Sequence, residues 1–330
     1  MSGITVLGAG AWGTALAITL ARSGYAVTLA VRRQAHLDSI ARDRVNSTYL
    51  SGVPFPPTLR PAAMESEVIA GAEIVVMAVP SRFARAVLTP LAAAIPPDAT
   101  VVSVTKGIEQ DSLRTMSQML TELAPPASRV AVLSGPGFAA EIARGKPAAL
   151  VSAGRDENVA RRVQTLFAAK PLRIYRSADV IGIELGGAVK NVIAIAAGIS
   201  DGLGLGSGAR AALITRGLAE MMRLATAAGA ERETLAGLAG LGDLVLTCTG
   251  DLSRNRSLGL TIGRGEPRPV PSAGESFAEG VPNTSAIRRL AESLKVEMPI
   301  VTAVYRILYE GAPANAMVDE LVSRELKAEF

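Results

Sequence analysis

The sequence predicts an α/β fold, in which a doubly wound and mainly parallel sheet is followed by a mostly α-helical C-terminal domain. Three observations predict it. Short β-branched runs alternate with helical stretches over the first half of the chain, a glycine-rich turn follows the first of these runs, and strand signals become sparse after Ser177. Alternation of this kind indicates right-handed βαβ units, which place helices on both faces of a sheet.

The strands of the first half are continuous apolar runs rather than alternating ones. Strands that are covered on both faces have this pattern. We therefore expect buried parallel strands at residues 4–7, 26–31, 74–79, 100–104 and 130–133. Residues 148–153 and 172–175 are expected to extend the same sheet with mixed strand direction.

The second half has a helical period. Residues 179–200 and 209–228 each predict one long helix, and residues 264–276, which are rich in Pro and Gly, predict a loop. One face of the second helix collects Ile214, Leu218, Met221, Met222 and Ala225. We accordingly assign residues 1–178 to a first domain and residues 179–330 to a second, helical domain.

Composition excludes several classes of protein. Of the 330 residues, 49% are hydrophobic and 19% are charged, which is the balance of a folded chain rather than a disordered one. The only cysteine is Cys248 and the only histidine is His36, so no intramolecular disulfide can form and His with Cys alone would leave a zinc ion short of ligands. We predict no metal site. Cys248 is interpreted as a small buried hydrophobe, with a reactive thiol as the alternative.

Charge and hydropathy bear on partners and location. The net charge is +4 with 4% aromatic residues and scattered arginines, whereas a nucleic-acid surface needs a concentrated basic stripe with aromatics. The apolar segment 4–21 lacks the preceding positive charge of a signal peptide. Residues 180–199 are apolar but contain Glu184 and Lys190, which argues against a membrane span. We expect a cytosolic protein without an integral membrane segment.

The glycine-rich turn predicts a dinucleotide site. Gly8, Ala9, Gly10, Ala11, Trp12 and Gly13 follow the first strand directly and open a helix. Gly8 allows a tight turn, Gly10 lets backbone N–H groups approach a pyrophosphate, and Gly13 lets the helix pack closely on the strand. The N-terminus of the helix adds partial positive charge. Because strand, turn and helix are in the right order, we predict a Rossmann-type domain; the alternative is a turn that is merely glycine-rich.

The end of the second strand bears on the choice of cofactor. An acidic residue there would bind the ribose hydroxyls of NADH, whereas Arg accommodates the 2′-phosphate of NADPH. Arg32 and Arg33 occupy this position and no carboxylate is adjacent. The pattern favours NADPH over NADH, with two solvated surface arginines as the alternative.

Lys190 is the best candidate for acid/base chemistry. It lies inside the first long helix, and Gly186 and Gly187 lie on its face one turn before it. Their missing side chains would leave room for a ligand. Burial and cationic neighbours would lower the pKa of Lys190 towards neutrality, which suits proton transfer. The alternative is a lysine that extends its ammonium group to solvent.

A second polar cluster predicts a phosphate site. Ser253 has the character of an N-cap, and Arg254 and Asn255 follow it in the first turn of a helix. A helix N-terminus that carries Arg binds phosphate readily, with an ordinary capped surface helix as the alternative. Lys106 comes just after a predicted strand, where open α/β sheets bind ligands, and Gly135-Pro136-Gly137 follows the next strand in the same way.

These blocks together resemble a known family, the bacterial NAD(P)-dependent glycerol-3-phosphate dehydrogenases, over nearly the whole chain. The matching blocks are GAGAWGTALA at 8–17, VTKGIE at 104–109, LSGPGFAAEIARGKPAAL at 133–150, KNVIAIAAGISDGLGLG at 190–206, LAGLGDLVLTCTGDLSRNRSLG at 238–259 and EGVPNT at 279–284. The Lys-Asn helix is shared with wider relatives, whereas the GLGDLVLTCT…SRN block is specific to this family.

The resemblance implies an enzyme that interconverts dihydroxyacetone phosphate and sn-glycerol 3-phosphate with NADH or NADPH. It implies Lys190 as the proton acceptor. It implies substrate contacts from Lys106, Gly135, Asp243, Ser253, Arg254 and Asn255, and cofactor contacts from Trp12, Arg33, Lys106, Ala139, Arg254 and Glu279. The family also implies a homodimer and a role in supplying glycerophospholipid synthesis.

One departure from the family is visible, because Gly137 stands where members usually have Ser. The side-chain hydroxyl is therefore absent, although the Gly137 N–H could still contact the substrate. Two other functions stay open from the residues. A β-hydroxyacid or ketopantoate-type dehydrogenase would have the same plan without the SRN block. A non-catalytic NAD(P)-sensing regulator would keep the glycine turn without needing Lys190, Asp243 and Arg254 together.

Overall fold

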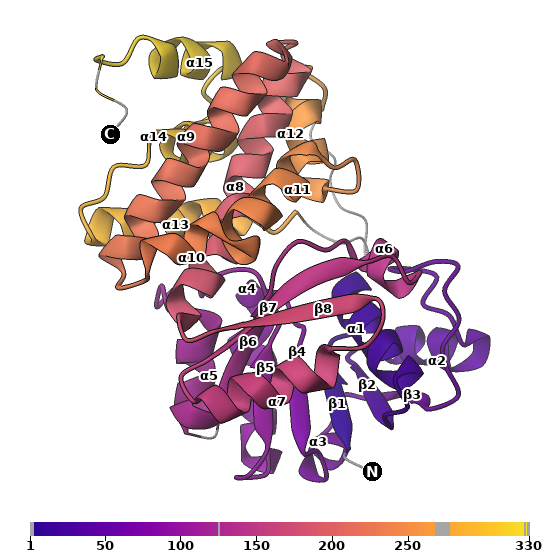
Figure 1. Ribbon diagram of the computed structural model, residues 1–330. Helices are drawn as coiled ribbons and strands as arrows, with labels where there is room; N and C mark the ends of the chain where they lie inside the picture. The colour runs from indigo at the N-terminus through magenta and orange to yellow at the C-terminus, as the bar shows by residue number, and fades with distance from the viewer. Residues whose placement is uncertain (1–2, 125, 268–277, 327, 329–330) are drawn as a thin grey trace.

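The computed structural model describes residues 3–124, 126–267, 278–326 and 328. Figure 1 shows a sheet with its covering helices below and a bundle of helices above. The sheet has eight strands in the order β3-β2-β1-β4-β5-β6-β7-β8. They are β1 Ile4–Leu7, β2 Val27–Val31, β3 Leu59–Ala63, β4 Ile74–Met77, β5 Thr100–Ser103, β6 Val130–Ser134, β7 Ala148–Gly154 and β8 Leu172–Ser177.

Strand direction is mostly parallel. β1 to β6 pair in parallel, β7 runs antiparallel to β6, and β8 runs parallel to β7. This confirms the predicted parallel sheet with an extension of mixed direction. Every residue of β1, β4, β5 and β6 is buried, which is why these strands have continuous apolar runs. The sequence analysis missed β3, an edge strand that contains Pro61 and pairs only with β2. Proline is tolerated at such an edge but weakens the strand pattern.

Helices cover both faces of the sheet. Apolar residues of α1 (Ala11–Arg22), α2 (Gln34–Asp43), α6 (Ala139–Ala143) and α7 (Glu157–Phe167) pack in one hydrophobic core. Those of α3 (Glu67–Ala70), α4 (Ser81–Leu88) and α5 (Met116–Leu123) pack in another, with the short 3₁₀ helix η1 (Thr89–Ala94). A second 3₁₀ helix, η2, spans Ala127–Arg129. The two cores confirm a doubly wound sheet.

The connectivity places a binding crevice at β1. This strand lies between β2 and β4, so the chain reverses its direction of strand addition there. Open α/β sheets bind ligands outside the carboxyl ends of the strands at such a switch point. The glycine-rich turn leaves the carboxyl end of β1, and Lys106 lies three residues after β5 ends.

The second region is built around one helix. α8 (Val180–Gly202) contacts α9 (Gly206–Ala227), α11 (Asp243–Thr249), α12 (Arg254–Gly263), α13 (Gly280–Ser293) and α14 (Pro299–Tyr309). α10 (Arg232–Ala236), the π-helical turn η3 (Leu238–Gly242) and α15 (Ala314–Val322) complete this region. By length and apolar composition α8 alone among the described helices could span a membrane, but 94% of its most apolar window is buried in the protein. Its apolar side chains pack in the hydrophobic core of this region, and Figure 1 shows α8 among the other helices of the bundle.

Both long helices predicted for the second half are present as α8 and α9. Met221 and Ala225 on the predicted apolar face of α9 are buried, and Ile214, Leu218 and Met222 are partly buried against the same core. The pattern did not indicate Glu220, which is buried and accepts a hydrogen bond from the Ile300 N–H at 2.7 Å at the start of α14. Of the predicted loop at 264–276, residues 268–276 lie outside the described residues.

Candidate active site

The glycine-rich turn has the geometry of a phosphate cradle. Gly8 has a φ of +109°, which L side chains rarely adopt. A Cβ at Gly13 would lie 2.1 Å from the Gly8 carbonyl oxygen, so α1 packs directly against the turn. At Gly10 a Cβ would meet nothing within 4 Å, and no side chain caps α1. The open space in front of bare helix N–H groups, including those of Ala11 and Trp12, fits the pyrophosphate of a dinucleotide.

The two arginines after β2 are exposed at the edge of this crevice. The Arg33 guanidinium donates a hydrogen bond to the Tyr49 hydroxyl at 3.1 Å. The Arg32 guanidinium lies 5.6 Å from the centre of the Phe83 ring, a cation–π contact. Both charged groups are therefore held at the carboxyl end of β2 with solvent on one side, and the first carboxylate after them is Asp38.

Two lysines from distant parts of the chain share one carboxylate. The Lys190 ammonium donates to Asp243 Oδ1 at 2.6 Å, and the Lys106 ammonium donates to Asp243 Oδ2 at 2.6 Å. Lys190 also donates to Thr247 Oγ1 at 2.7 Å, and Lys106 to the Gly135 carbonyl oxygen at 2.9 Å. Lys190 and Asp243 are 5% and 1% exposed, so Lys190 does not extend to solvent. Each ammonium group thus makes two hydrogen bonds to the protein and has a third N–H left.

Local structure explains how Asp243 reaches both lysines. Asp243 is the first residue of α11, directly after the π-helical turn η3, which packs against α8. Such irregular turns often occur at functional sites. Thr247 follows Asp243 by four residues and so lies on the same helix face. The Thr247 hydroxyl donates to the Asp243 carbonyl oxygen at 2.6 Å, which leaves its oxygen to accept from Lys190.

Burial changes the acidity of Lys190. Loss of hydration lowers its pKa from 10.5 to about 8, with Asp243 acting in the opposite direction and Lys106 adding to the decrease. A like charge and a low-dielectric environment both disfavour the ammonium form. The direction agrees with the sequence prediction of a pKa lowered towards neutrality.

The glycines before Lys190 do not leave the predicted room for a ligand. A Cβ at Gly186 would lie 2.7 Å from the Ala239 carbonyl oxygen, because η3 packs against α8 there. A Cβ at Gly187 would lie 3.0 Å from Ser134 Oγ and 3.4 Å from Lys106 Cγ. The prediction was wrong in its reason, since the protein itself occupies both spaces. The glycines instead let η3 and the Lys106 side chain approach the helix that carries Lys190.

Asparagines connect the elements around the lysines. Asn255 Nδ2 donates to Asn191 Oδ1 at 2.9 Å, and the Gly280 N–H donates to Asn255 Oδ1 at 2.9 Å. The Lys106 carbonyl oxygen accepts from Asn283 Nδ2 at 3.1 Å. The Asn255 side chain is therefore engaged with the protein. No role was predicted for Asn191, Asn283 or Thr247, although all three lie inside quoted blocks and Thr247 shares a helix face with Asp243.

The predicted phosphate site is the start of α12. Ser253 is the N-cap, and its hydroxyl accepts from the Arg256 N–H at 3.2 Å. This confirms Ser253 as a capping residue. The N–H groups of Arg254 and Asn255 precede the capped one, and the Arg254 side chain is exposed. A helix start with two N–H groups and one guanidinium can bind an anion.

The remaining predicted residues come from both regions of the chain. Gly135, with φ +135°, gives its carbonyl oxygen to Lys106. A Cβ at Gly137 would lie 3.6 Å from the Trp12 ring, and the Lys106 ammonium lies 5.7 Å from the centre of that ring. Ala139 is the first residue of α6. Glu279 immediately precedes α13; burial raises its pKa, and the charge of Arg254 opposes this most strongly.

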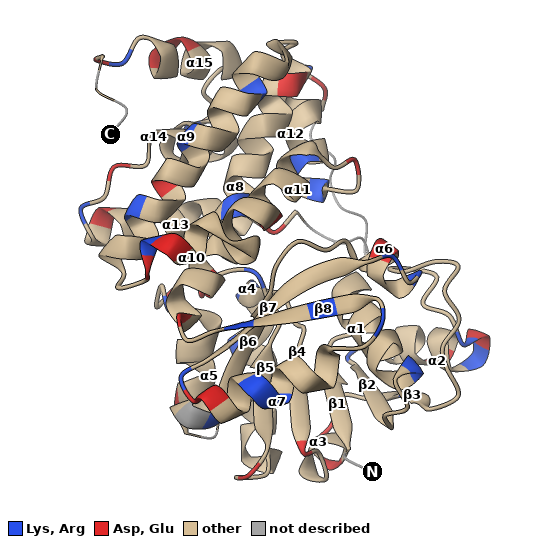
Figure 2. Ribbon diagram, in the orientation of Figure 1, with Lys and Arg blue, Asp and Glu red and all other residues tan. Residues whose placement is uncertain are grey.

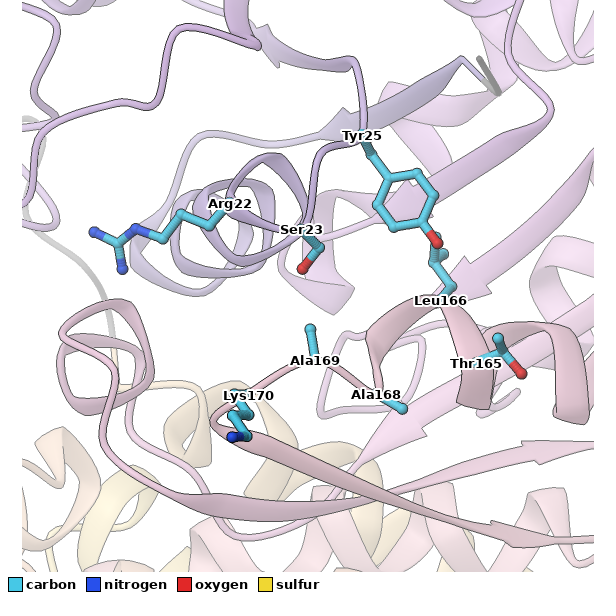
Figure 3. Close-up of a pocket in the computed structure, with 8 residues that line it drawn as sticks. All are labelled: Arg22, Ser23, Tyr25, Thr165, Leu166, Ala168, Ala169 and Lys170. Carbon is cyan, nitrogen blue, oxygen red and sulfur yellow. The ribbon is translucent and has the colours of Figure 1, made fainter.

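A cavity elsewhere in the described chain lies apart from the predicted site residues. A cavity of about 440 Å³, shown in Figure 3, lies between the end of α1 and the connection after α7, and none of the predicted residues lines it. No group of three or more metal-ligating side chains occurs among the described residues. Burial raises the pKa of the Cys248 thiol to about 12, which supports its interpretation as a small hydrophobe. Figure 2 shows Lys and Arg scattered over both regions in this view.

Known proteins match this chain over both regions. Residues 3–160 match the family model described as the NAD-dependent glycerol-3-phosphate dehydrogenase N-terminus, and residues 179–319 match that of the C-terminus. A glycerol-3-phosphate dehydrogenase [NAD(P)+] of Anaeromyxobacter dehalogenans is 50% identical over 329 residues, 99% of each chain. The crystal structure of glycerol-3-phosphate dehydrogenase from Coxiella burnetii is 40% identical with a TM-score of 0.92, and the match covers 98% of this chain and 99% of that one.

A more distant likeness concerns one alternative function. A ketopantoate reductase structure from Ralstonia eutropha has a TM-score of 0.61 at 19% identity over 96% of this chain and 99% of that one, which shows a shared fold only. The full-length matches overrule the ketopantoate-type reading and that of a non-catalytic regulator. The chain belongs to the NAD-dependent glycerol-3-phosphate dehydrogenase family.

Proposed function

We propose that Lys190 is the acid/base of an enzyme that interconverts dihydroxyacetone phosphate and sn-glycerol 3-phosphate, and that Lys106 holds and polarises the substrate carbonyl. The observation that carries this proposal is the pair of lysines on Asp243, beside the glycine-rich turn of a dinucleotide site. A bound nicotinamide supplies or accepts hydride at C2 of the substrate. The protein has to move the accompanying proton.

The hydrogen bonds of Lys190 determine which of its N–H groups transfers the proton. In the reductive direction, negative charge grows on the C2 oxygen, and the third N–H of the Lys190 ammonium donates the proton to it. The two remaining N–H groups stay on Asp243 Oδ1 and Thr247 Oγ1, which both act as acceptors. The lone pair of the neutral amine then faces the substrate. In the oxidative direction this lone pair removes the hydroxyl proton as hydride leaves.

Asp243 holds both lysines, in addition to the substrate contact that the family resemblance implies for it. Each of its carboxylate oxygens already accepts from one ammonium group. A buried ammonium without a counter-ion would be costly, so the carboxylate keeps both lysines in place and partly restores the pKa of Lys190. Lys106 retains one N–H, which can donate to the carbonyl oxygen of the substrate and stabilise its developing charge.

The phosphate of the substrate is assigned to the start of α12. The N–H groups of Arg254 and Asn255 and the Arg254 guanidinium supply the donors, and Ser253 shapes the turn through its cap. The Gly137 N–H is a further donor towards the substrate. Because the Asn255 side chain is engaged by Asn191 and Gly280, we assign its substrate contact to the backbone.

We assign residues 1–178 to the dinucleotide and residues 179–330 to the substrate and catalysis. Arg32 and Arg33 favour NADPH over NADH, with the remaining predicted cofactor contacts at Gly8, Gly10, Ala11, Trp12, Gly13, Lys106, Ala139, Arg254 and Glu279. We also propose a cytosolic homodimer.

The test is the absorbance of NADPH at 340 nm with dihydroxyacetone phosphate as substrate. The proposal expects NADPH oxidation that depends on dihydroxyacetone phosphate and the reverse reaction with sn-glycerol 3-phosphate. Ketopantoate is the comparison substrate. Turnover of ketopantoate without turnover of dihydroxyacetone phosphate would refute the proposal.

A further inference from the structure

A second arginine near the proposed phosphate site has no role in the mechanism above. Arg256 lies in the first turn of α12, and its side chain is only 16% exposed. Its Nε donates to Asp201 Oδ2 at 2.9 Å, its Nη2 lies 2.8 Å from the same oxygen, and its Nη1 donates to Asp251 Oδ1 at 3.0 Å. All three nitrogens of its guanidinium therefore contact carboxylates of the protein.

Asp201 connects three helices through this contact. It lies in the last turn of α8, and its carboxylate also accepts from the Arg210 guanidinium of α9 at 3.0 and 3.1 Å. With 11% of its side chain exposed, Asp201 is largely shielded from solvent. Ion pairs that are partly buried and shared by several donors hold geometry better than isolated surface pairs do.

The backbones of α8 and α12 touch along a glycine seam. A Cβ at Gly198 would lie 2.0 Å from the Arg256 carbonyl oxygen, and one at Gly259 would lie 2.1 Å from the Ile195 carbonyl oxygen. Gly202 and Gly263 continue the seam one turn later, where a Cβ would lie 2.5 Å and 2.4 Å from backbone oxygens. This packing sets the separation of the two helices, but smooth glycine surfaces do not by themselves fix how far one helix slides or turns on the other.

Two polar contacts with α8 fix the sliding and rotation of α12, which the glycine seam leaves open. Asn255 bonds to Asn191, and Arg256 bonds to Asp201, ten residues and about 15 Å further along the same helix. The first turn of α12 is thus attached at both ends of this stretch of α8. Arg256 also holds Asp251, which precedes the N-cap. The direction of the α12 N–H groups relative to Lys190 depends on these attachments.

We propose that the Arg256–Asp201 pair is a positioning device for the phosphate of the substrate, with Arg256 aiming the N-terminus of α12 and Asp201 holding Arg256. This inference rests on the proposed phosphate site. Arg256 does not contact the phosphate itself, because its guanidinium is turned to Asp201 and Asp251. The pair therefore tunes affinity for the phosphorylated substrate without entering the hydride and proton transfer.

The first test is Arg256→Met. The KM for dihydroxyacetone phosphate should rise about tenfold, the scale of one lost charge-assisted contact, and the inhibition constant of inorganic phosphate should rise in parallel. The kcat should change little, because uniform substrate binding is what is lost. The Kd of NADPH should change less than this KM, because Arg254 is only one of the proposed cofactor contacts. Arg256→Lys should recover part of the effect. Arg264→Met, at the other end of α12, is the matched control and should leave all four values unchanged.

Asp201→Asn separates positioning from direct contact. If the pair positions α12, this variant should reproduce the higher KM and phosphate inhibition constant of Arg256→Met. The double variant should then have a KM no higher than that of either single variant. A direct phosphate contact by Arg256 expects Asp201→Asn to leave the KM unchanged or to lower it, which would overturn the proposal. Equal losses in dihydroxyacetone phosphate and NADPH binding, with a lower Tm, would make the pair merely structural and would also overturn it.

Arg254→Ala distinguishes failure of the inference from failure of the proposed phosphate site. If Arg254→Ala raises the KM for dihydroxyacetone phosphate and Arg256→Met does not, only the positioning role is wrong. If neither variant changes this KM, the phosphate binds elsewhere and both assignments are wrong.

Discussion

The two regions of this molecule recognise ligands by different means. The sheet region offers mainly backbone, since its glycine turn presents bare N–H groups and needs Gly8 and Gly13 to exist at all. The helical region offers charged side chains, with Lys190 and Asp243 buried and Arg254 at a helix start. Lys106 is the exception, because it is a charged residue of the sheet region that forms an ion pair with Asp243 of the helical region. Binding through backbone N–H groups requires close packing of the turn, whereas buried charged side chains require counter-ions. Of these two kinds of group, only the charged side chains can transfer protons.

Lys190→Met is expected to have the largest effect, and it tests whether catalysis and cofactor binding depend on different regions. It keeps length and apolar bulk but deletes the titrating group, so turnover should fall by about 10²–10⁴. The Kd of NADPH should stay close to that of the unchanged protein, because Lys190 is not among the proposed cofactor contacts. Steady-state rates at 340 nm and a fluorescence titration of NADPH measure the two quantities.

Lys106→Met is the control, because Lys106 is the rival proton donor on the same carboxylate. It should impair substrate binding and polarisation. Substantial turnover in the Lys190 variant together with an inactive Lys106 variant would exchange the roles of the two lysines.

Arg254→Ala tests whether the Arg254 side chain binds the phosphate of the substrate. Loss of a charge-assisted contact should cost about 1.5–3 kcal/mol, or roughly ten- to a hundred-fold in kcat/KM for dihydroxyacetone phosphate. Dihydroxyacetone, which has no phosphate, should be used about as slowly by the variant as by the unchanged protein. If both substrates suffer alike, Arg254 is structural or serves only the cofactor.

Arg33→Asp tests a place where the sheet region is proposed to use side-chain charge on the cofactor. The variant should weaken NADPH binding by roughly ten- to a hundred-fold and NADH binding far less, because only NADPH has the 2′-phosphate. The ratio of the two dissociation constants is the measurement. An equal effect on both cofactors would show that Arg33, held by Tyr49, does not contact that phosphate.

Gly13→Ala and Gly10→Ala form a matched pair within one turn. A Cβ at Gly13 meets the Gly8 carbonyl oxygen at 2.1 Å, so Gly13→Ala should lower the free energy of unfolding by about 1–3 kcal/mol. A Cβ at Gly10 meets nothing within 4 Å, so Gly10→Ala should leave stability intact and weaken NADPH binding. Denaturant unfolding and NADPH titration separate the two effects. Equal stability of the two variants would contradict the packing role of Gly13.

The sequence was most informative where local chemistry sets the geometry. The glycine turn, the apolar strands and the Ser253 cap each depend on a few adjacent residues, and each is present. The edge strand β3 was missed because Pro61 disrupts its pattern, while pairing with β2 and packing against α1 and α2 stabilise it. That stabilisation is a tertiary effect, which no local period records.

The site shows the same limit in its side chains. Lys190 could be singled out because a lysine in an apolar helix is costly. That Asp243 would bridge Lys190 and Lys106 could not be deduced, since the three residues are joined only by the packing of η3 and of the Lys106 side chain against α8. The same packing fills the spaces at Gly186 and Gly187, which the sequence analysis had reserved for a ligand.

The pH dependence is the last test of the comparison, because the charged side chains of the helical region titrate and the backbone N–H groups of the sheet region do not. Burial lowers the pKa of Lys190 to about 8. Reduction needs the ammonium form of the free enzyme, so kcat/KM for dihydroxyacetone phosphate should fall about tenfold for each pH unit above about 8. Oxidation needs the amine, so kcat/KM for sn-glycerol 3-phosphate should fall about tenfold for each pH unit below about 8. Backbone N–H groups do not titrate, so the Kd of NADH should be flat between about pH 7 and pH 9. A single inflection shared by turnover and NADH binding would mean that the two regions are not independent.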